Sequence, residues 1–336
     1  MTDQLTPRSA RPRPRVLPDY PFQSRWFDSS AGRQHYVAEG PPGGAPVLML
    51  HGNPTWSYYW RRLISGLRAD HRCVAPDLGG MGLSSRPAEP FTADGFDARV
   101  ERVEGLVRHL VREDGAPEDG WTVVVHDWGG PLGLRWACSH PERVARLVIL
   151  NTVAFPWPEG HRLHWGLRAV HDSALLARLS NRYNIFARAV TYLGLRSRMP
   201  RAVRKAYLAP YGRAGERRSI EEFVRAIPLH PSDMGWDMAR RLGDDLDVLR
   251  RVPTLLCWGM RDPVFDDRVL AEWLRRMPHA RPRLYPEAGH LLLEDAPLRV
   301  TQDVRDFLSA SAAPSPSPSP SPSSGTHAAA PRAPRA

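Results

Sequence analysis

Short apolar runs alternate with amphipathic stretches along most of this 336-residue chain. Each run has the length of a buried strand and ends at glycine, proline, asparagine or aspartate. The predicted strands are "VLMLHG" (47–52), "CVAPDLGG" (73–80), "WTVVVHD" (121–127), "RLVILNT" (146–152), "TLLCWGM" (254–260) and "RPRLYPEAGH" (281–290). The predicted helices cover about 55–67, 93–112, the residues up to about 138, 266–277 and 297–309. Such alternation predicts a mostly parallel sheet with helices on both faces.

The alternation stops between residues 154 and 248, where the spacing is helical and arginine, tryptophan and tyrosine are frequent. Sites in α/β folds form beyond the carboxyl ends of the strands, so an insertion there would roof the site and exclude water. We therefore predict a helical lid (154–248) between two parts of one core (21–153 and 249–310). The basic, proline-rich residues 1–20 and the Ser/Pro-rich residues 311–336 lack the apolar side chains that would offset ordering entropy, and we expect disordered tails.

Composition narrows the possible functions. The net charge is +10, but Lys205 is the only lysine, which indicates a bias toward arginine rather than a nucleic-acid-binding face, and no nucleic-acid motif accompanies it. No apolar run reaches about 18 residues, so we expect no membrane span, and the first residues lack the apolar centre of a secretory signal. The three cysteines have no motif spacing, which favours a reduced, cytoplasmic protein. The sequence carries no signal of oligomeric state.

The segment "VVVHDWGGPLG" (123–133) is a strand, a tight turn and the start of a helix, the arrangement that presents a catalytic nucleophile. Asp127 occupies the position at the turn, and Gly129 and Gly130 permit the helix to approach the strand closely. A carboxylate is ionised at neutral pH and needs no base in order to attack. It can displace a leaving group from a saturated carbon and form an alkyl ester on the protein, which water then hydrolyses.

The partners of such a nucleophile follow it in the chain. Asp262 comes directly after the strand 254–260, and His290 lies on a loop after the last strand. We expect Asp262 to orient the imidazole and His290 to activate the hydrolytic water. Asp266 and Asp267 are better explained as charges at the start of the next helix, and the position after "RLVIL" holds Asn151, which cannot ionise.

Two further residues provide hydrogen-bond donors. The backbone N–H groups of Asn53, in "HGNPTW" (51–56), and Trp128 are candidates for an oxyanion hole. Their side-chain amide and indole N–H groups suit a departing halide, which needs donors but no proton. We interpret His51 and His126 as structural residues of the loops. The scheme calls for no cofactor and no metal, only a small apolar substrate.

The motifs "HGNPTWSYYWR", "PDLGGMGLSS", "VHDWGG" and "AGHLLLEDAP" resemble the haloalkane dehalogenases of the α/β-hydrolase superfamily. The resemblance covers residues 25–153 and 250–309, and it implies an α/β-hydrolase fold with a helical lid inserted after the sixth strand. It also implies that Asp127, Asp262 and His290 are nucleophile, acid and base, and that Trp128 and Asn53 bind halide. The late position of the acid, with Asn53 as second donor, is similar to the third subfamily of that family.

Other reactions remain open. The third subfamily is similar to the β-lactone decarboxylases of bacterial long-chain olefin biosynthesis, and "NIFARAV", "YLAPYGRAGERRSIEEFVRAIP" and "GMRDPVF" resemble those enzymes. An epoxide hydrolase would need lid tyrosines as proton donors, for which the candidates are Tyr183, Tyr192, Tyr207 and Tyr211. A non-catalytic protein on this scaffold is disfavoured because no member of the triad is missing. The candidate pocket residues of the lid are Trp157, Trp165, Phe186 and Trp236.

Overall fold

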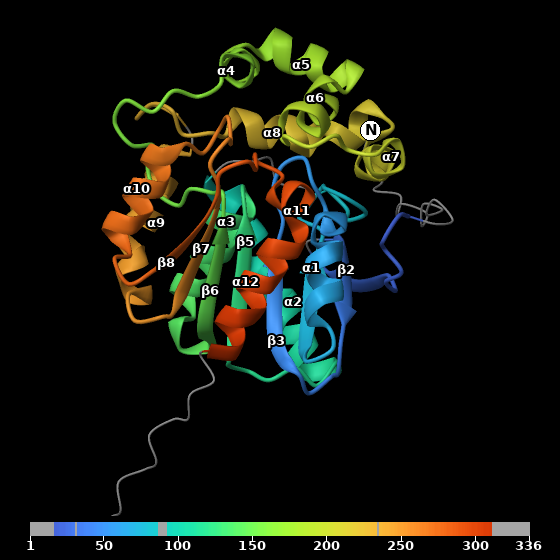
Figure 1. The fold of residues 1–336 in the computed structure, drawn as a ribbon. Helices are drawn as coiled ribbons and strands as arrows, with labels where there is room; N and C mark the ends of the chain where they lie inside the picture. The colour runs from blue at the N-terminus through green and yellow to red at the C-terminus, as the bar shows by residue number, and fades with distance from the viewer. Residues whose placement is uncertain (1–16, 31, 87–92, 234, 311–336) are drawn as a thin grey trace, which may run out of the picture.

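The computed structural model describes residues 17–30, 32–86, 93–233 and 235–310. In this part of the chain, eight strands form one sheet in the order β1-β2-β4-β3-β5-β6-β7-β8, and all neighbours from β4 to β8 are parallel (Figure 1). The strands are β1 (Arg25–Ser29), β2 (Gly32–Glu39), β3 (Ala45–Leu50), β4 (His71–Pro76), β5 (Trp121–His126), β6 (Val144–Leu150), β7 (Thr254–Gly259) and β8 (Arg281–Tyr285). The predicted mostly parallel sheet is confirmed.

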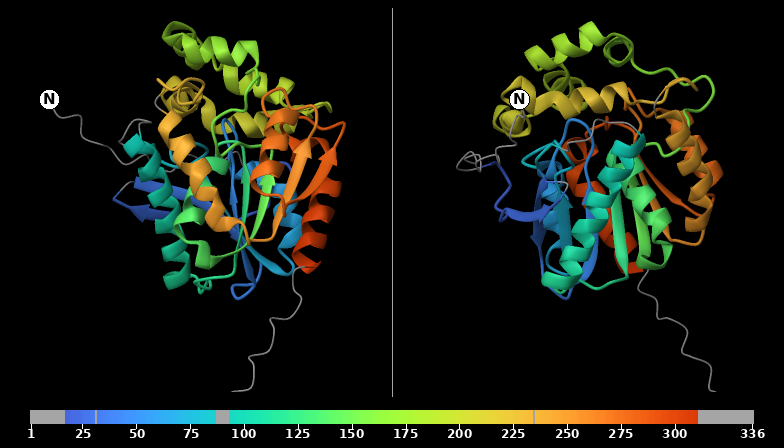
Figure 2. Two further views of the ribbon diagram at one scale, coloured as in Figure 1. Left: turned by 90° about the vertical axis from the view of Figure 1, so that its left-hand side faces the viewer. Right: turned by 180° about the vertical axis from the view of Figure 1, so that it is seen from behind.

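Helices cover both faces of this sheet (Figures 1 and 2). On one face lie α1 (Arg61–Leu67), which follows the short 3₁₀ helix Ser57–Trp60, and α12 (Pro297–Ala310), next to the short α11 (Leu292–Asp295). The other face is covered by α2 (Ala93–Glu113), α3 (Gly129–Ser139) and α10 (Asp267–Arg276). The central strands are therefore shielded from water on both sides.

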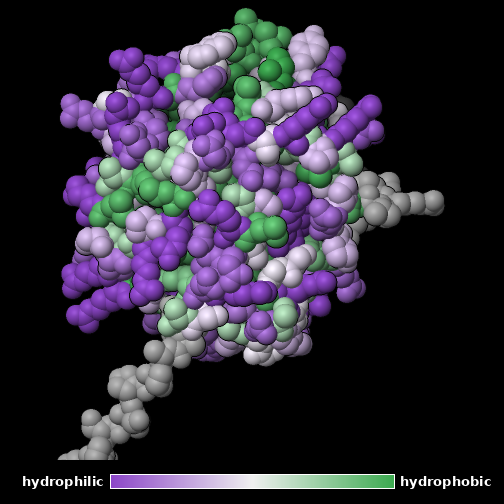
Figure 3. All heavy atoms as spheres, in the orientation of Figure 1, coloured by the Kyte–Doolittle hydropathy of each residue, from purple (hydrophilic) through white to green (hydrophobic). Residues whose placement is uncertain are grey.

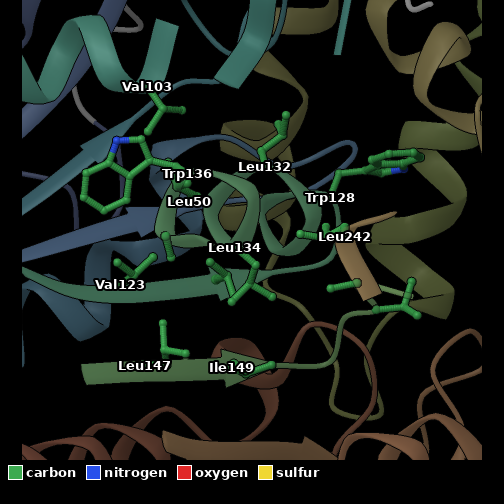
Figure 4. Close-up of a cluster of buried hydrophobic side chains, with 14 of the residues drawn as sticks. Leu50, Val103, Val123, Trp128, Leu132, Leu134, Trp136, Leu147, Ile149 and Leu242 are labelled. Atoms are coloured by element: carbon green, nitrogen blue, oxygen red, sulfur yellow. The ribbon is translucent and has the colours of Figure 1, made fainter. Parts of the chain in front are cut away.

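This two-sided cover explains why the central strands are continuous apolar runs. Successive side chains of a strand point to opposite faces, so Val123 and Val125 of β5 pack under α2 and α3, whereas Val124 packs toward α1 and α12. All three valines are fully buried. Figure 4 shows the apolar cluster on the side of α2 and α3, in which Val123 and Leu147 of neighbouring strands lie below Leu134 of α3.

The lid, which is the set of helices inserted between β6 and β7, follows the sixth strand as predicted. Its helices are α4 (Trp165–Asp172), α5 (Ala174–Tyr183), α6 (Ile185–Leu193), α7 (Arg201–Leu208), α8 (Arg218–Arg225) and α9 (Trp236–Asp245). In Figure 1, α4 to α8 lie across the top of the sheet, beyond the carboxyl ends of its parallel strands. The last helix, α9, packs beside α3 at the flank of the core.

A buried ion pair joins the lid to both halves of the core. The guanidinium of Arg61 donates to both carboxylate oxygens of Glu294, at 2.5 and 2.9 Å, and Tyr207 of α7 donates to the same carboxylate at 2.6 Å. Removing one partner of a buried pair leaves the other charge unpaired, which typically lowers the free energy of unfolding by about 3–5 kcal/mol. These three side chains therefore hold α1, α11 and α7 together near the carboxyl edge of the sheet.

Two features differ from the sequence-based expectations. The antiparallel pair β1 and β2 was not predicted, because its sequence mixes arginine, glutamine and histidine with the apolar positions. Leu17 and Tyr20 fall inside the expected N-terminal tail, but they are buried, and the hydroxyl of Tyr20 lies 2.7 Å from that of Ser57. The remainder of that tail and the expected tail 311–336 lie outside the described residues.

The three cysteines are free thiols. Burial raises the pKa of Cys73, Cys138 and Cys257 to about 12, so these thiols stay protonated at neutral pH. Among the described residues, no helix is long and apolar enough to cross a membrane, and no group of metal-ligating side chains comes together.

Candidate active site

The turn between β5 and α3 carries Asp127 at the carboxyl edge of the sheet. Its φ angle is +49°, in the left-handed region that few residues other than glycine adopt. The backbone N–H of Asp127 donates to the Asn151 carbonyl (3.2 Å), and the Thr152 hydroxyl donates to the Asp127 carbonyl (2.5 Å). These bonds to the end of β6 hold the turn in its unusual conformation.

The two glycines after this turn allow close packing of α3. A Cβ atom at Gly129 would collide with the backbone of Leu50, and one at Gly130 would collide with the side chain of Thr152. Helix α3 can therefore start directly against β3 and the end of β6. This close start places the side chain of Asp127 beyond the strand ends.

Two backbone N–H groups bind the carboxylate of Asp127. The N–H of Asn53 donates to its Oδ1 at 2.6 Å, and the N–H of Trp128 also donates to the carboxylate. Burial raises the pKa of Asp127, while His290 and these two N–H groups act in the opposite direction. The two N–H groups predicted to form an oxyanion hole thus both contact the carboxylate of Asp127.

The imidazole of His290 lies between the two carboxylates. Its Nδ1–H donates to Asp262 Oδ2 at 2.8 Å, which leaves Nε2 facing Asp127 Oδ2 at 3.8 Å. The other oxygen of Asp262 accepts hydrogen bonds from the backbone N–H groups of Val264 (2.8 Å) and Phe265 (3.2 Å). Asp262 is therefore fixed by its own loop and in turn fixes the orientation of the ring.

Burial acts to lower the pKa of His290, but the charge and hydrogen bond of Asp262, together with the charge of Asp127, raise it above its ordinary value. His126 supports the same loop from below. Its Nε2–H donates to the carbonyl of His290 at 2.9 Å, and burial keeps the pKa of His126 well below its ordinary value. A neutral, buried His126 fits its interpretation as a structural residue.

The remaining histidine and acid candidates also have structural roles. His51 accepts a hydrogen bond from the Leu78 N–H at 2.8 Å. Asp266 caps α10 by accepting from the N–H groups of Arg268 and Val269, and Asp267 is the first residue of that helix. Asn151 is fully buried and exchanges two hydrogen bonds with the backbone of Gly259, at 2.8 and 3.1 Å, which joins the ends of β6 and β7.

The side chains of Trp128 and Asn53 both line the cavity above Asp127. The indole of Trp128 extends from the start of α3 toward the lid (Figure 4), where its ring meets that of Phe223 edge-on, with centroids 5.1 Å apart. The Nδ2 group of Asn53 donates one hydrogen bond to the carbonyl of Ile220 in α8, at 3.1 Å. The lid helix α8 thus contacts both predicted donors.

The cavity has a volume of about 550 Å³ and is bounded by the core below and the lid above. Its lining is mainly aliphatic and aromatic, with Asp127 and His290 at its base, which is typical of a site for an apolar small molecule. Of the four lid aromatics expected there, Trp157, Trp165 and Phe186 line it and Trp236 does not. None of the four lid tyrosines proposed as proton donors lines it.

Several lining residues were not predicted. Val153, Ala154 and Phe155 come two residues after the end of β6, and Pro263, Val264 and Phe265 directly follow Asp262. Their position after the end of a parallel strand was the available signal, because such positions meet at one edge of the sheet. The polar lid residues His164 and Arg196 also line the cavity, and the sequence carried no signal for them.

Comparison with known proteins agrees with this fold. The family model for the α/β hydrolase fold matches residues 45–297, and the chain belongs to this family. Haloalkane dehalogenase DatA from Agrobacterium tumefaciens has a similar fold, with a TM-score of 0.76, 21% identity and coverage of 86% of this chain and 97% of that one.

Curated relatives have two kinds of name. The cis-3-alkyl-4-alkyloxetan-2-one decarboxylase of Shewanella oneidensis is 38% identical over 86% of this chain and 89% of its own length, and that of Xanthomonas campestris is 38% identical over 87% and 98%. The haloalkane dehalogenase 2 of Mycobacterium tuberculosis is 36% identical over 84% of this chain and 93% of its own length. Both groups fall within the resemblance that the sequence motifs indicated.

The pKa of His290 provides a test of this geometry. We expect His290 to titrate above its ordinary value of 6.5, so that its imidazolium form persists at a higher pH than that of an exposed histidine. In Asp262→Asn the stabilising charge is lost while burial remains, and the pKa of His290 should fall. NMR titration of ring-labelled histidine, assigned with His290→Gln, measures both values.

Asp266→Asn is the matched control, because this carboxylate caps α10 and does not touch His290. The same His290 titration curve in wild type and Asp262→Asn would contradict the assigned pair. A shift in Asp266→Asn equal to that in Asp262→Asn would do so as well.

Proposed function

We propose that this protein is an enzyme in which Asp127 attacks a saturated carbon of a small apolar substrate and forms an alkyl ester. The carboxylate geometry carries the proposal: the Asn53 N–H binds Oδ1, the Trp128 N–H also binds the carboxylate, and Oδ2 is the oxygen that lies next to His290. In this scheme Oδ2 is the nucleophile. Oδ1 already occupies the oxyanion hole in which negative charge develops when the ester is hydrolysed.

The first step in a haloalkane is displacement of halide. Oδ2 forms a bond to carbon as the carbon–halogen bond breaks, and the halide leaves with the electron pair. The indole N–H of Trp128 and the free N–H of the Asn53 amide would bind this anion. In an apolar cavity few other donors compete for it, which supports carbon–halogen cleavage as the reaction of this site.

The second step is hydrolysis of the ester. Nε2 of His290 takes a proton from water, the water oxygen attacks Cγ of Asp127, and the resulting oxyanion on Oδ1 is stabilised by the two backbone N–H groups. As this intermediate collapses, the imidazolium of His290 returns its proton to the leaving oxygen, which releases the alcohol. The carboxyl group then loses its proton to solvent and is a carboxylate again. Asp262 stabilises the imidazolium that forms.

In this proposal residues 154–248 are a lid domain that closes the site over a core of residues 21–153 and 249–310. The aliphatic and aromatic lid side chains exclude bulk water from the halide and from the ester. The free cysteines support operation in a reducing compartment, and we propose the cytoplasm.

Decarboxylation of a β-lactone is the second candidate, and the relatives favour it: the two decarboxylases are 38% identical to this chain and haloalkane dehalogenase 2 is 36% identical. Asp127 would attack the saturated ring carbon that is bonded to the ring oxygen. The bond between this carbon and the ring oxygen breaks, and a carboxylate is left on the neighbouring carbon. Loss of carbon dioxide then moves its electron pair into a new carbon–carbon double bond, and the Asp127 oxygen leaves. This sequence consumes no water. Epoxide hydrolysis has less support, because no candidate tyrosine lines the cavity.

The His290→Ala variant should trap the ester, because attack by Asp127 needs no base whereas hydrolysis does. Incubated with a bromoalkane, it should release about one equivalent of bromide and then stop. Mass spectrometry of the intact protein and its peptides should place one alkyl group on Asp127. Asp127→Ala should show neither bromide release nor adduct.

A His290→Ala protein that remains unmodified by every bromoalkane would argue against halide chemistry. If the wild type then converts a β-lactone into alkene and carbon dioxide, the reaction is the decarboxylation.

Replacing Trp128 by phenylalanine tests the halide donor. The ring still packs against Phe223, but one N–H is lost, and loss of a transition-state donor typically lowers the rate by about 10²–10³. Trp165→Phe is the control, since Trp165 lines the cavity but is 79% exposed at its rim. Steady-state release of bromide measures the rate of each variant. Equal loss in the two variants, or no loss in Trp128→Phe, would exclude Trp128 as the donor.

A further inference from the structure

The outer helices of the lid present apolar side chains to solvent. Of the twelve large hydrophobic side chains that are exposed in the described residues, eight lie between residues 165 and 193, on α4, α5 and α6. We call the six most exposed of them the lid patch, with exposed fractions from 52 to 79%: Trp165, Leu175, Tyr183, Ile185, Tyr192 and Leu193. A surface helix normally turns its apolar stripe toward the core, whereas part of the apolar surface of these helices faces solvent.

Helix α5 shows this most directly. Leu175, Leu179 and Tyr183 recur every four residues and therefore share one face, and all three are exposed. The buried residues of this helix are the small Ala177 and Ser180. In Figure 3 the hydrophobic group at the top of the molecule corresponds to the outermost lid helices of Figure 1. A group of exposed apolar side chains on neighbouring helices is a candidate interaction site.

The segment that contains these helices and the start of α7 is strongly basic. Residues 161–205 contain nine arginines, one lysine and one aspartate, a net charge of +9 compared with +10 for the entire chain. Nine of these ten cationic side chains are exposed, and Arg204 is half-buried. The single acid, Asp172, pairs with Arg168 at 3.3 Å. The apolar patch is therefore surrounded by positive charge that acids of the same segment do not neutralise, and Figure 3 shows hydrophilic side chains next to the apolar group.

We propose that the lid patch docks on an anionic lipid bilayer. Tryptophan and leucine that enter the interface, flanked by arginines that reach anionic headgroups, are the two features that bind a helix in the plane of such a membrane. A second copy of this chain is a poor occupant, because two surfaces with a charge of +9 repel each other. Nucleic acid would match the charge, but phosphate contacts make no use of exposed leucine and tyrosine rows.

The position of the cavity gives this docking a consequence. Trp165, Ile185 and Leu193 belong to the lid patch and also line the cavity. The cavity therefore reaches the surface at the patch. A docked protein would receive an apolar molecule from the bilayer without its passage through water; this consequence rests on the proposed function, whereas the docking itself does not.

Vesicle flotation of the full chain tests the docking, and because it measures only binding, its result is independent of the reaction catalysed. The wild type should float with phosphatidylcholine vesicles that contain phosphatidylglycerol, bind them less at high salt, and bind pure phosphatidylcholine weakly. Absence of binding to the anionic vesicles, or equal binding to both compositions, would overturn the proposal. Light scattering without vesicles checks self-association: a dimer that the patch variants disrupt would identify a second copy as the occupant instead.

Matched pairs of variants separate the patch from the rest of the surface. Leu175→Asn with Tyr183→Asn should lower the vesicle partition coefficient about tenfold or more, whereas Val248→Asn with Leu298→Asn, two exposed apolar residues outside the lid patch, should not. Arg178→Glu with Arg188→Glu should lower it at least about tenfold, whereas Arg251→Glu with Arg281→Glu should have a small effect. Thermal unfolding verifies that each variant is folded. Equal losses in patch and control variants would refute docking through the lid patch.

Discussion

The site depends on one constraint of the backbone: Asp127 has a φ angle of +49° in the turn between β5 and α3. That conformation turns the carboxylate away from the strand and toward the N–H groups of Asn53 and Trp128. Hydrogen bonds from the Asp127 N–H and the Thr152 hydroxyl hold this conformation. Helix α3 begins against β3 and the segment after β6, where a Cβ atom at position 129 or 130 would collide with Leu50 or Thr152. The sheet, the glycines and the first turn of α3 are thus all needed to present one carboxylate.

The second half of the site is built separately, from the loops that follow β7 and β8. Asp262 accepts two backbone hydrogen bonds from its own loop and one from His290, so the ring has a fixed tautomer before a substrate enters. The two halves are distant in the sequence and meet where His290 Nε2 lies 3.8 Å from Asp127 Oδ2, and the hydrogen bond from His126 to the His290 carbonyl joins them. The pair Arg61–Glu294 and the hydroxyl of Tyr207 hold the lid and α11 close to this junction.

The sequence predicted the central strands and placed the five candidate site residues beyond their carboxyl ends, because both inferences follow local rules. Buried parallel strands are short apolar runs, and the residues that follow them meet at one edge, which brought Asp127, Asp262 and His290 together in the prediction. The antiparallel pair β1 and β2 was not predicted, because the hydrogen-bond partners of its polar residues, such as the buried Gln34 and His35, come only from tertiary contacts. The lid could be predicted as helical, but not the direction in which its apolar side chains point. Helical spacing gives the same pattern for a face turned to the cavity and for one turned to solvent, as Phe186 and Tyr183 illustrate.

The central claim, that Asp127 itself attacks the substrate, can be tested by following oxygen through a single turnover. With enzyme in excess over a bromoalkane in water enriched in ¹⁸O, the ester is hydrolysed at Cγ, so the alcohol should carry the ordinary oxygen of Asp127. Because hydrolysis of the ester adds the water oxygen to Cγ, the label should instead appear in the Asp127 peptide as a mass increase of about two daltons. Alcohol that carries ¹⁸O together with an unlabelled Asp127 would show that water attacks the substrate directly, and would contradict the account.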